Sequence, residues 1–173
     1  MRNSISLTLA ILATLFSSVS AHPTYYPDVY RNESCTKPSP AKIYSYHIHL
    51  MYVNTNKQQV NDAYRIRDAF IAKFKSQLGP DSKDLFHNDY NCMLEPDTTP
   101  AGPFPIAEWS VFVLPESLLP MMQWMSQYRE NYSVLVHPNT GCEVEDHSDW
   151  ALWNGDAFPL DITIFSKDKP FPW

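Results

Sequence analysis

The chain has 173 residues, of which 44% are hydrophobic and 14% aromatic, a composition that excludes intrinsic disorder and is sufficient for one folded domain. Its formal net charge is −6 and it has no cluster of Lys and Arg, so the sequence argues against binding to nucleic acid or to anionic membranes. Three cysteines permit one disulfide and leave one thiol over.

The first 21 residues have the pattern of a secretory signal peptide, with Arg2 as the positive start, an apolar run, and Val19-Ser20-Ala21 as the cleavage site. No later stretch approaches the roughly 20 apolar residues of a transmembrane helix. We therefore expect a secreted, extracellular protein. The expected parts are a leader, an extended Pro-rich arm and a single domain, over residues 1–21, 22–42 and 43–173.

Secretion would give meaning to two glycosylation sequons, which begin at Asn32 and Asn131. It would also make His22 the first residue of the mature chain. An amino-terminal histidine can bind copper through its amine and ring nitrogens, provided that the fold holds a second histidine nearby.

Hydrophobic periodicity predicts four strands and two helices. In chain order they are a strand over 44–53, a helix over 57–78, strands over 90–94 and 106–114, a helix over 115–129 and a strand over 133–136, which His137-Pro138 ends. Four prolines predict a rigid loop over residues 95–105.

This order of elements is typical of the α+β, ferredoxin-like split βαβ fold (βαββαβ). It predicts a helix-covered, four-stranded antiparallel sheet in the order 4-1-3-2, followed by a C-terminal extension. The first strand then lies beside the fourth and antiparallel to it. Cys35, which precedes the first strand, is therefore close to Cys142, which follows the fourth. We predict a Cys35–Cys142 disulfide and a free Cys92 on the far edge strand.

Four histidines are candidates for a metal site. His47 and His49 alternate along the first strand and therefore face the same side of the sheet. His137 follows the neighbouring strand, and His147 lies among four carboxylates in the segment 143–150. Mixed imidazole and carboxylate ligation with open positions suits non-haem Fe(II), Mn(II) or catalytic zinc. The alternatives are satisfied strand histidines and an ordinary acidic surface loop.

Four sequence motifs, in this order and with approximately this spacing, resemble those of the fungal-type DOPA 4,5-dioxygenase family between residues 44 and 164. They are Tyr44-Ser45-Tyr46-His47-Ile48, Gly102-Pro103-Phe104-Pro105, Leu135-Val136-His137-Pro138-Asn139-Thr140, and Asp146-His147 with Trp153-Asn154-Gly155.

The resemblance implies an Fe(II)-dependent extradiol dioxygenase that uses O₂ to cleave the ring of a catechol, a small aromatic substrate. The candidate ligands by themselves leave Mn, Zn and Cu as alternative metals. It implies that His47, His137 and His147 serve as metal ligands or as the acid/base. Tyr46 and Trp153 are candidates for stacking on the substrate ring, although a buried aromatic is more often part of a core.

Two features depart from the family pattern. Phe104 occupies the position of the family's loop histidine and can neither bind a metal nor transfer a proton; we expect His49 to compensate from the strand. The leader is the second departure, because this chemistry is expected inside the cell. The alternative functions are a secreted metal-binding or phenol-binding module without turnover, and a structural protein whose histidine face is filled by core side chains. The sequence is compatible with a homodimer.

Overall fold

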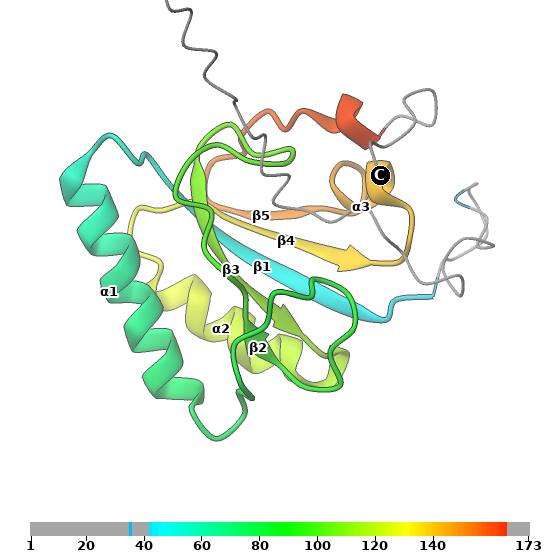
Figure 1. Ribbon diagram of the computed structural model, residues 1–173, viewed down its shortest axis with the longest axis horizontal. Coiled ribbons are helices and arrows are strands. Elements are labelled where there is room, and N and C mark those ends of the chain that lie inside the picture. Colours follow the sequence, from blue (N-terminus) through cyan, green and yellow to red (C-terminus); the bar gives the residue numbers. More distant parts are fainter. Residues whose placement is uncertain (1–34, 36–41, 166–173) are drawn as a thin grey trace, which may run out of the picture.

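One antiparallel sheet with the two long helices on one face is the framework of the protein (Figure 1). The computed structural model describes residue 35 and residues 42–165. Its strands are β1 (Ser45–Tyr52), β2 (Cys92–Met93), β3 (Ala107–Val113), β4 (Val134–Asn139) and β5 (Leu152–Asn154). Its helices are α1 (Lys57–Phe74), α2 (Leu118–Tyr128) and α3 (Glu143–Asp146), with 3-10 turns η1 (Pro115–Ser117) and η2 (Ile162–Phe165).

The strand order is β2-β3-β1-β4-β5, and every neighbouring pair is antiparallel. The predicted order of the first four strands is therefore confirmed. The structure adds β5 on the outer edge of β4, within the region expected to be only an extension.

The end of β4 differs from the prediction, because the strand continues through His137 and Pro138 to Asn139. β5 pairs only with residues 134–136, which leaves one edge of β4 open beside Pro138. A proline is tolerated at such an edge, since no sheet hydrogen bond needs its missing N–H. His137 is consequently a strand residue with a fixed direction rather than part of a turn.

The disulfide between Cys35 and Cys142 is confirmed, with the two Cα atoms 5.5 Å apart. Cys92 is free, also as predicted, and the structure shows that it is buried. The leader, His22 and the Asn32 sequon lie outside the described residues, whereas Asn131 is exposed in the turn before β4. Within the described part of the chain, no helix has the length and apolarity needed to cross a membrane.

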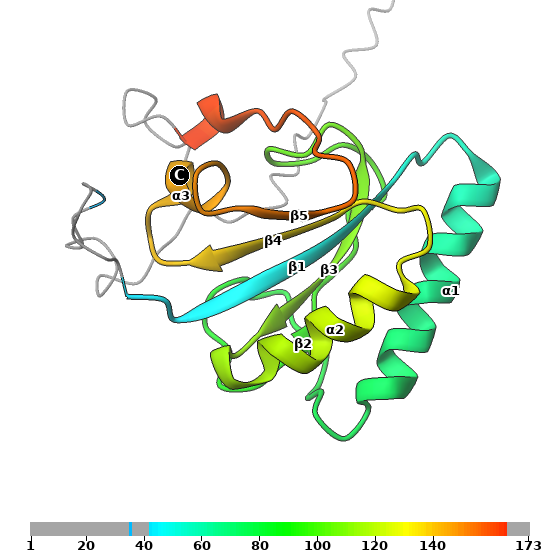
Figure 2. The same cartoon turned by 180° about the vertical axis from the view of Figure 1, so that it is seen from behind.

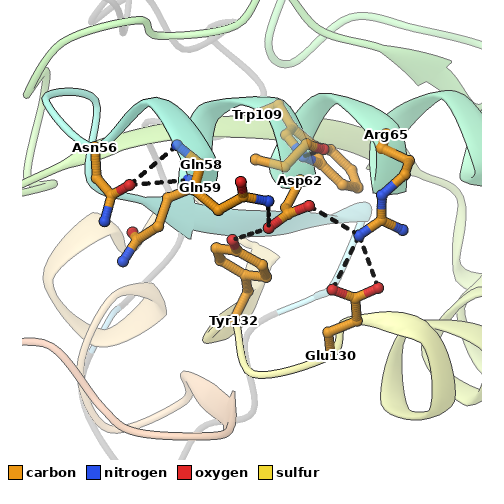
Figure 3. A network of polar contacts seen from close by, with 9 residues as sticks. Asn56, Gln58, Gln59, Asp62, Arg65, Trp109, Glu130 and Tyr132 are labelled. Atoms are coloured by element: carbon orange, nitrogen blue, oxygen red, sulfur yellow. Dashed lines mark hydrogen bonds and ion pairs between the residues drawn. The ribbon is translucent and has the colours of Figure 1, made fainter.

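Helix α1 begins where the sequence predicts and ends earlier. The Asn56 side chain accepts hydrogen bonds from the backbone N–H groups of Gln58 and Gln59 at 3.0 and 3.3 Å, which caps the helix (Figure 3). The regular helix stops at Phe74, and the residues up to 77 form turns.

A polar network joins α1 to the turn that follows α2. Arg65 bonds Asp62 of its own helix and Glu130 of the turn, at 3.1 and 2.8 Å, and the Tyr132 hydroxyl donates to Asp62 (Figure 3). Glu130 has a positive φ of 54°. Because the Arg65 and Glu130 side chains are well exposed, the pair contributes little to stability and mainly fixes the turn.

The main core lies between the sheet and the helices α1 and α2 (Figure 2). Alternate β1 residues such as Ile48 and Leu50 face the helices and are fully buried. Trp109 of β3 is also fully buried, and its indole N–H donates to the carbonyl of Ala63 in α1 at 2.9 Å. This bond fixes α1 to β3, the strand beside the histidine-bearing strand β1.

Replacing Trp109 with phenylalanine is expected to lower the free energy of unfolding by about 2–4 kcal/mol. The change leaves the buried Ala63 carbonyl without this donor and leaves a cavity where the larger ring was. Urea unfolding measures the loss. Tyr128→Phe is the control, because Tyr128 is 54% exposed and the change should alter stability by less than about 0.5 kcal/mol. Equal effects of the two substitutions would contradict the prediction.

Candidate metal centre

The face of the sheet opposite α1 and α2 carries three histidines. His47 and His49 point to this face from β1, and His137 of β4 lies directly across from His47. All three are at most 2% exposed. Their ligand atoms lie within 4.8 Å of one another, so the side chains are placed to share one metal ion.

Rings from other segments cover this three-histidine cluster. The Phe104 ring lies 4.6 Å from the ring of His49, and the Phe86 ring lies 6.1 Å from that of His47. His147, which follows α3, lies 4.0 Å from His137, and Phe165 lies 4.7 Å from His147. In Figure 1, α3 and η2 lie on the side of the sheet away from α1 and α2. The cluster is therefore shielded from bulk water.

The hydrogen bonds of two histidines identify the nitrogens that carry lone pairs. His47 Nε2 lies 2.8 Å from the carbonyl oxygen of Leu85, and His137 Nδ1 lies 3.0 Å from that of Pro138. A carbonyl oxygen only accepts, so both of these nitrogens donate. In the neutral rings, His47 Nδ1 and His137 Nε2 therefore carry lone pairs. His47 Nδ1 is buried and has no hydrogen-bond partner within the described part of the chain.

His49 connects this cluster to a buried carboxyl group. Its Nε2 lies 3.1 Å from Nε2 of His137, and its Nδ1 lies 3.1 Å from Oε2 of Glu108. Since His137 Nε2 has no hydrogen, His49 supplies the one between the two rings in the metal-free protein. When His49 Nε2 loses this hydrogen, Nδ1 of His47 and Nε2 of both His49 and His137 carry lone pairs within one buried site.

Burial keeps these histidines neutral. It lowers the pKa of His47, His49 and His137 well below the ordinary value of 6.5, and the neighbouring imidazoles lower it further. Metal ligands must be neutral imidazoles, so the site is in the required state at neutral pH. The unpartnered lone pair of His47 and the facing Nε2 atoms of the other two rings fit a divalent metal ion such as Fe(II), Zn(II) or Cu(II).

His147, the fourth predicted ligand, lies next to the cluster and is not one of the three residues that share the site. Its Nδ1 lies 3.0 Å from the backbone carbonyl and 3.1 Å from Oε2 of Glu143, one turn earlier. This arrangement fixes the ring against His137.

No carboxylate of the described residues joins the three histidines in a shared site, in contrast to the expected mixed ligation. The acidic segment folds back towards β4, where Asp146 accepts from the backbone N–H and the hydroxyl of Thr140, at 3.0 and 2.8 Å. These bonds hold the turn between β4 and α3, and so the position of His147.

Glu108 is the functional candidate that the sequence patterns missed. It lies in an apolar run that predicts a central strand, and the hydrophobic periodicity of this run does not indicate a functional role for a polar residue there. A signal was present, because Glu108 and Ser110 are the polar residues of that strand and alternate onto one face. Burial raises the pKa of Glu108 to about 8, and burial together with the charge of Glu108 raises the pKa of Asp97 to about 7.

The two predicted stacking residues lie on opposite faces of the sheet. Tyr46 packs against the core beneath α1 and α2, where it cannot contact a ligand of the cluster. Trp153 of β5 packs with Phe104, Met51 and Leu135 on the histidine side. Only Trp153 therefore remains a candidate for contact with a bound ring.

Between pH 6.5 and pH 8, the metal-free protein should lose stability as the pH rises. Burial raises the pKa of Asp146 to about 7, so the folded chain ionises this group in that range, whereas the unfolded chain has already done so near 3.8. The folded state thus holds more protons at the lower pH, and each such group contributes up to about 1.4 kcal/mol per pH unit. Asp97 and Glu108 act in the same direction.

Urea unfolding at several pH values measures this slope. Asp146→Asn should flatten it, because an amide does not titrate but still accepts from the Thr140 N–H and donates to its hydroxyl oxygen. Below pH 6.5 the buried neutral histidines oppose the trend, since the unfolded chain then takes up protons that the folded chain does not. A variant with the parent's slope would show that Asp146 does not titrate in this range.

Comparison with known proteins relates this chain to the Dopa 4,5-dioxygenase family. The sequence model of the Dopa 4,5-dioxygenase family matches residues 46–164. A DOPA 4,5-dioxygenase from Amanita muscaria is 25% identical over 122 residues, and an uncharacterized 21.2 kDa protein from Botryotinia fuckeliana is 35% identical over 78 residues. The Amanita match covers 70% of this chain and 50% of that relative. The Botryotinia match covers 40% of this chain and 43% of that relative. The chain thus spans about half the length of the curated relatives it matches.

A solved structure has a similar fold. It is the crystal structure of a putative dioxygenase from Nostoc punctiforme, which is 27% identical in sequence and superimposes with a TM-score of 0.56. The match covers 70% of this chain and 90% of that one. The matched family region contains the three histidines of the cluster together with Phe104, Glu108 and His147.

Proposed function

Because the chain belongs to the Dopa 4,5-dioxygenase family, we propose that it is a metal-dependent dioxygenase that uses Fe(II) and O₂ to cleave the ring of a catechol. The observation that carries this proposal is the buried cluster of His47, His49 and His137 with its inward lone pairs. Bound Fe(II) would supply Lewis acidity and a redox centre for O₂.

The chain's own residues would provide the remaining chemistry. The three histidines hold the metal and leave part of its coordination sphere for other ligands. His147, fixed by Glu143 and lying against His137, holds or moves the proton of a catechol hydroxyl. The phenyl rings of Phe86, Phe104 and Phe165 exclude water, which strengthens every electrostatic interaction inside.

The packing of Phe104 favours a second candidate, a metal-holding module without turnover. Its ring lies on His49, is 3% exposed, and closes the cluster together with the neighbouring segments. A catechol would have to displace part of this cover before its oxygens reached the metal. If the cover does not open, the protein binds a metal and has no catalytic activity.

Metal analysis followed by a catechol assay distinguishes these functions. Purified protein is loaded with Fe(II) without oxygen, its metal content is measured, and a panel of catechols including DOPA is added with O₂. The dioxygenase should bind about one iron per chain and form a yellow semialdehyde. Iron uptake without product from any catechol supports the module, and failure to take up any metal contradicts both proposals.

We further propose that the chain is secreted as a single domain over residues 43–173, after removal of residues 1–21. Support comes from the Cys35–Cys142 disulfide, a bond that persists in oxidising compartments, and from the exposed Asn131 of a glycosylation sequon. Expression in a eukaryotic host and mass analysis of the culture medium test this. Retention of the uncleaved chain in the cells would contradict it.

A further inference from the structure

We propose that Glu108 is a positioning residue of the candidate metal centre, which holds the His49 ring so that Nε2 faces the metal. Oε2 of Glu108 lies 3.1 Å from Nδ1 of His49, on the side of the ring away from His137. The inference rests on the proposed function, since it assigns a role around the same metal.

The burial of Glu108 needs an explanation. The side chain is 2% exposed in a strand whose seven residues are all buried, and no Lys or Arg of the described residues forms an ion pair with it. A buried carboxyl without a strong partner destabilises the fold. The imidazole of His49 is such a partner. The destabilising burial of Glu108 therefore occurs beside a residue that we propose as a metal ligand.

The carboxyl group is itself held in place. Asp97 and Ser110 hydrogen-bond its side chain, and the backbone N–H of Glu108 donates to the Asp97 carbonyl at 3.0 Å. β3 pairs with β1 in a register that puts Glu108 opposite Met51, two residues from His49. These contacts hold the Glu108 carboxyl group in one position, with Oε2 directed at Nδ1 of His49.

This contact determines which ring nitrogen faces the cluster. A metal on Nε2 needs the lone pair of that nitrogen, so His49 would then carry its hydrogen on Nδ1 and donate it to the ionised Glu108 carboxylate, which only accepts. In the metal-free protein the His49 hydrogen lies on Nε2, and the protonated Glu108 carboxyl donates to Nδ1 instead. Nε2 is the atom that faces His137 and the metal site. Carboxylates behind metal-bound histidines act in this way, and removing them typically weakens metal binding about 10- to 100-fold.

Titration with Co(II), followed by its visible absorption, tests the proposal in the full chain. Glu108→Gln keeps the size of the side chain but presents either an oxygen or an NH₂ group to Nδ1. We expect Co(II) to bind about 10- to 100-fold more weakly, with a shifted absorption spectrum. Asp62→Asn is the control, because it makes the same change from carboxyl to amide in α1, on the opposite face of the sheet, and its affinity should remain that of the parent. Equal affinities of the two variants would overturn the proposal.

A second measurement does not depend on metal binding. In metal-free protein with ¹⁵N-labelled histidine, Glu108→Gln should move the Nδ1 and Nε2 resonances of His49 and leave those of His87 in place. If the parent binds no Co(II), the proposed function fails, and this measurement still decides whether Glu108 holds the ring. Unchanged His49 resonances would overturn the proposal in either case. If Glu108→Gln does not fold, Glu108→Asp replaces it, with a smaller loss of affinity expected because the carboxylate remains.

Discussion

Replacing His137 with alanine is expected to reduce metal affinity at least about a hundred-fold, since loss of a ligand should cost more than loss of a residue behind one. His137 is central to the cluster, because its Nε2 lies 3.1 Å from that of His49 and its ring contacts both His47 and His147. Co(II) titration or metal analysis after dialysis measures the loss. The alanine side chain offers no donor to a metal.

His87→Ala is the matched control. This histidine is 41% exposed and hydrogen-bonds Asp84 in a surface loop, so its removal should leave the affinity of the parent unchanged. His49→Ala should reduce affinity as His137→Ala does. Retention of parental affinity in His49→Ala would show that this residue does not take the place of the histidine that the family pattern has at position 104, and that the ligand set lies elsewhere.

The order of the first four strands could be predicted because each has a clear hydrophobic pattern and the ferredoxin-like connection allows one arrangement. That order also placed Cys35 beside Cys142 and His137 beside His47, and the structure contains both neighbours. The short elements β5 and α3 could not be predicted, since three or four residues show no period. Contacts with β4 and η2, rather than local propensity, hold them.

The histidine cluster followed from alternation along β1, but its surroundings did not. Glu108 sits in a strand whose neighbours predict only burial, and its contact with His49 exists because β3 pairs with β1 in one particular register. His147 lies beside the cluster because a four-residue helix and the Asp146–Thr140 hydrogen bonds position it there. Such long-range contacts depend on register and loop path, which a single sequence does not encode in any local pattern.

Replacing Phe104 with histidine is expected to raise metal affinity about tenfold or more and to lower the stability of the metal-free protein. The Phe104 ring lies 4.6 Å from that of His49 and 6.3 Å from that of His147, so an imidazole there would add a fourth donor at the edge of the cluster. Without metal, the change removes apolar contacts with Met51 and Leu135 and buries a polar ring, at a cost of about 2–4 kcal/mol.

Co(II) titration, urea unfolding with and without metal, and the catechol assay together test this substitution. Phe104→Leu is the control, because it removes the aromatic ring and supplies no donor. If the proposed dioxygenase chemistry is limited by the missing imidazole, Phe104→His should form more product than the parent, and Phe104→Leu should not. Product from both variants would instead show that the bulk of Phe104 blocks the substrate. If the two variants bind Co(II) with the same affinity, the loop does not bring position 104 close enough to the metal, and the position acts only as a cover over His49.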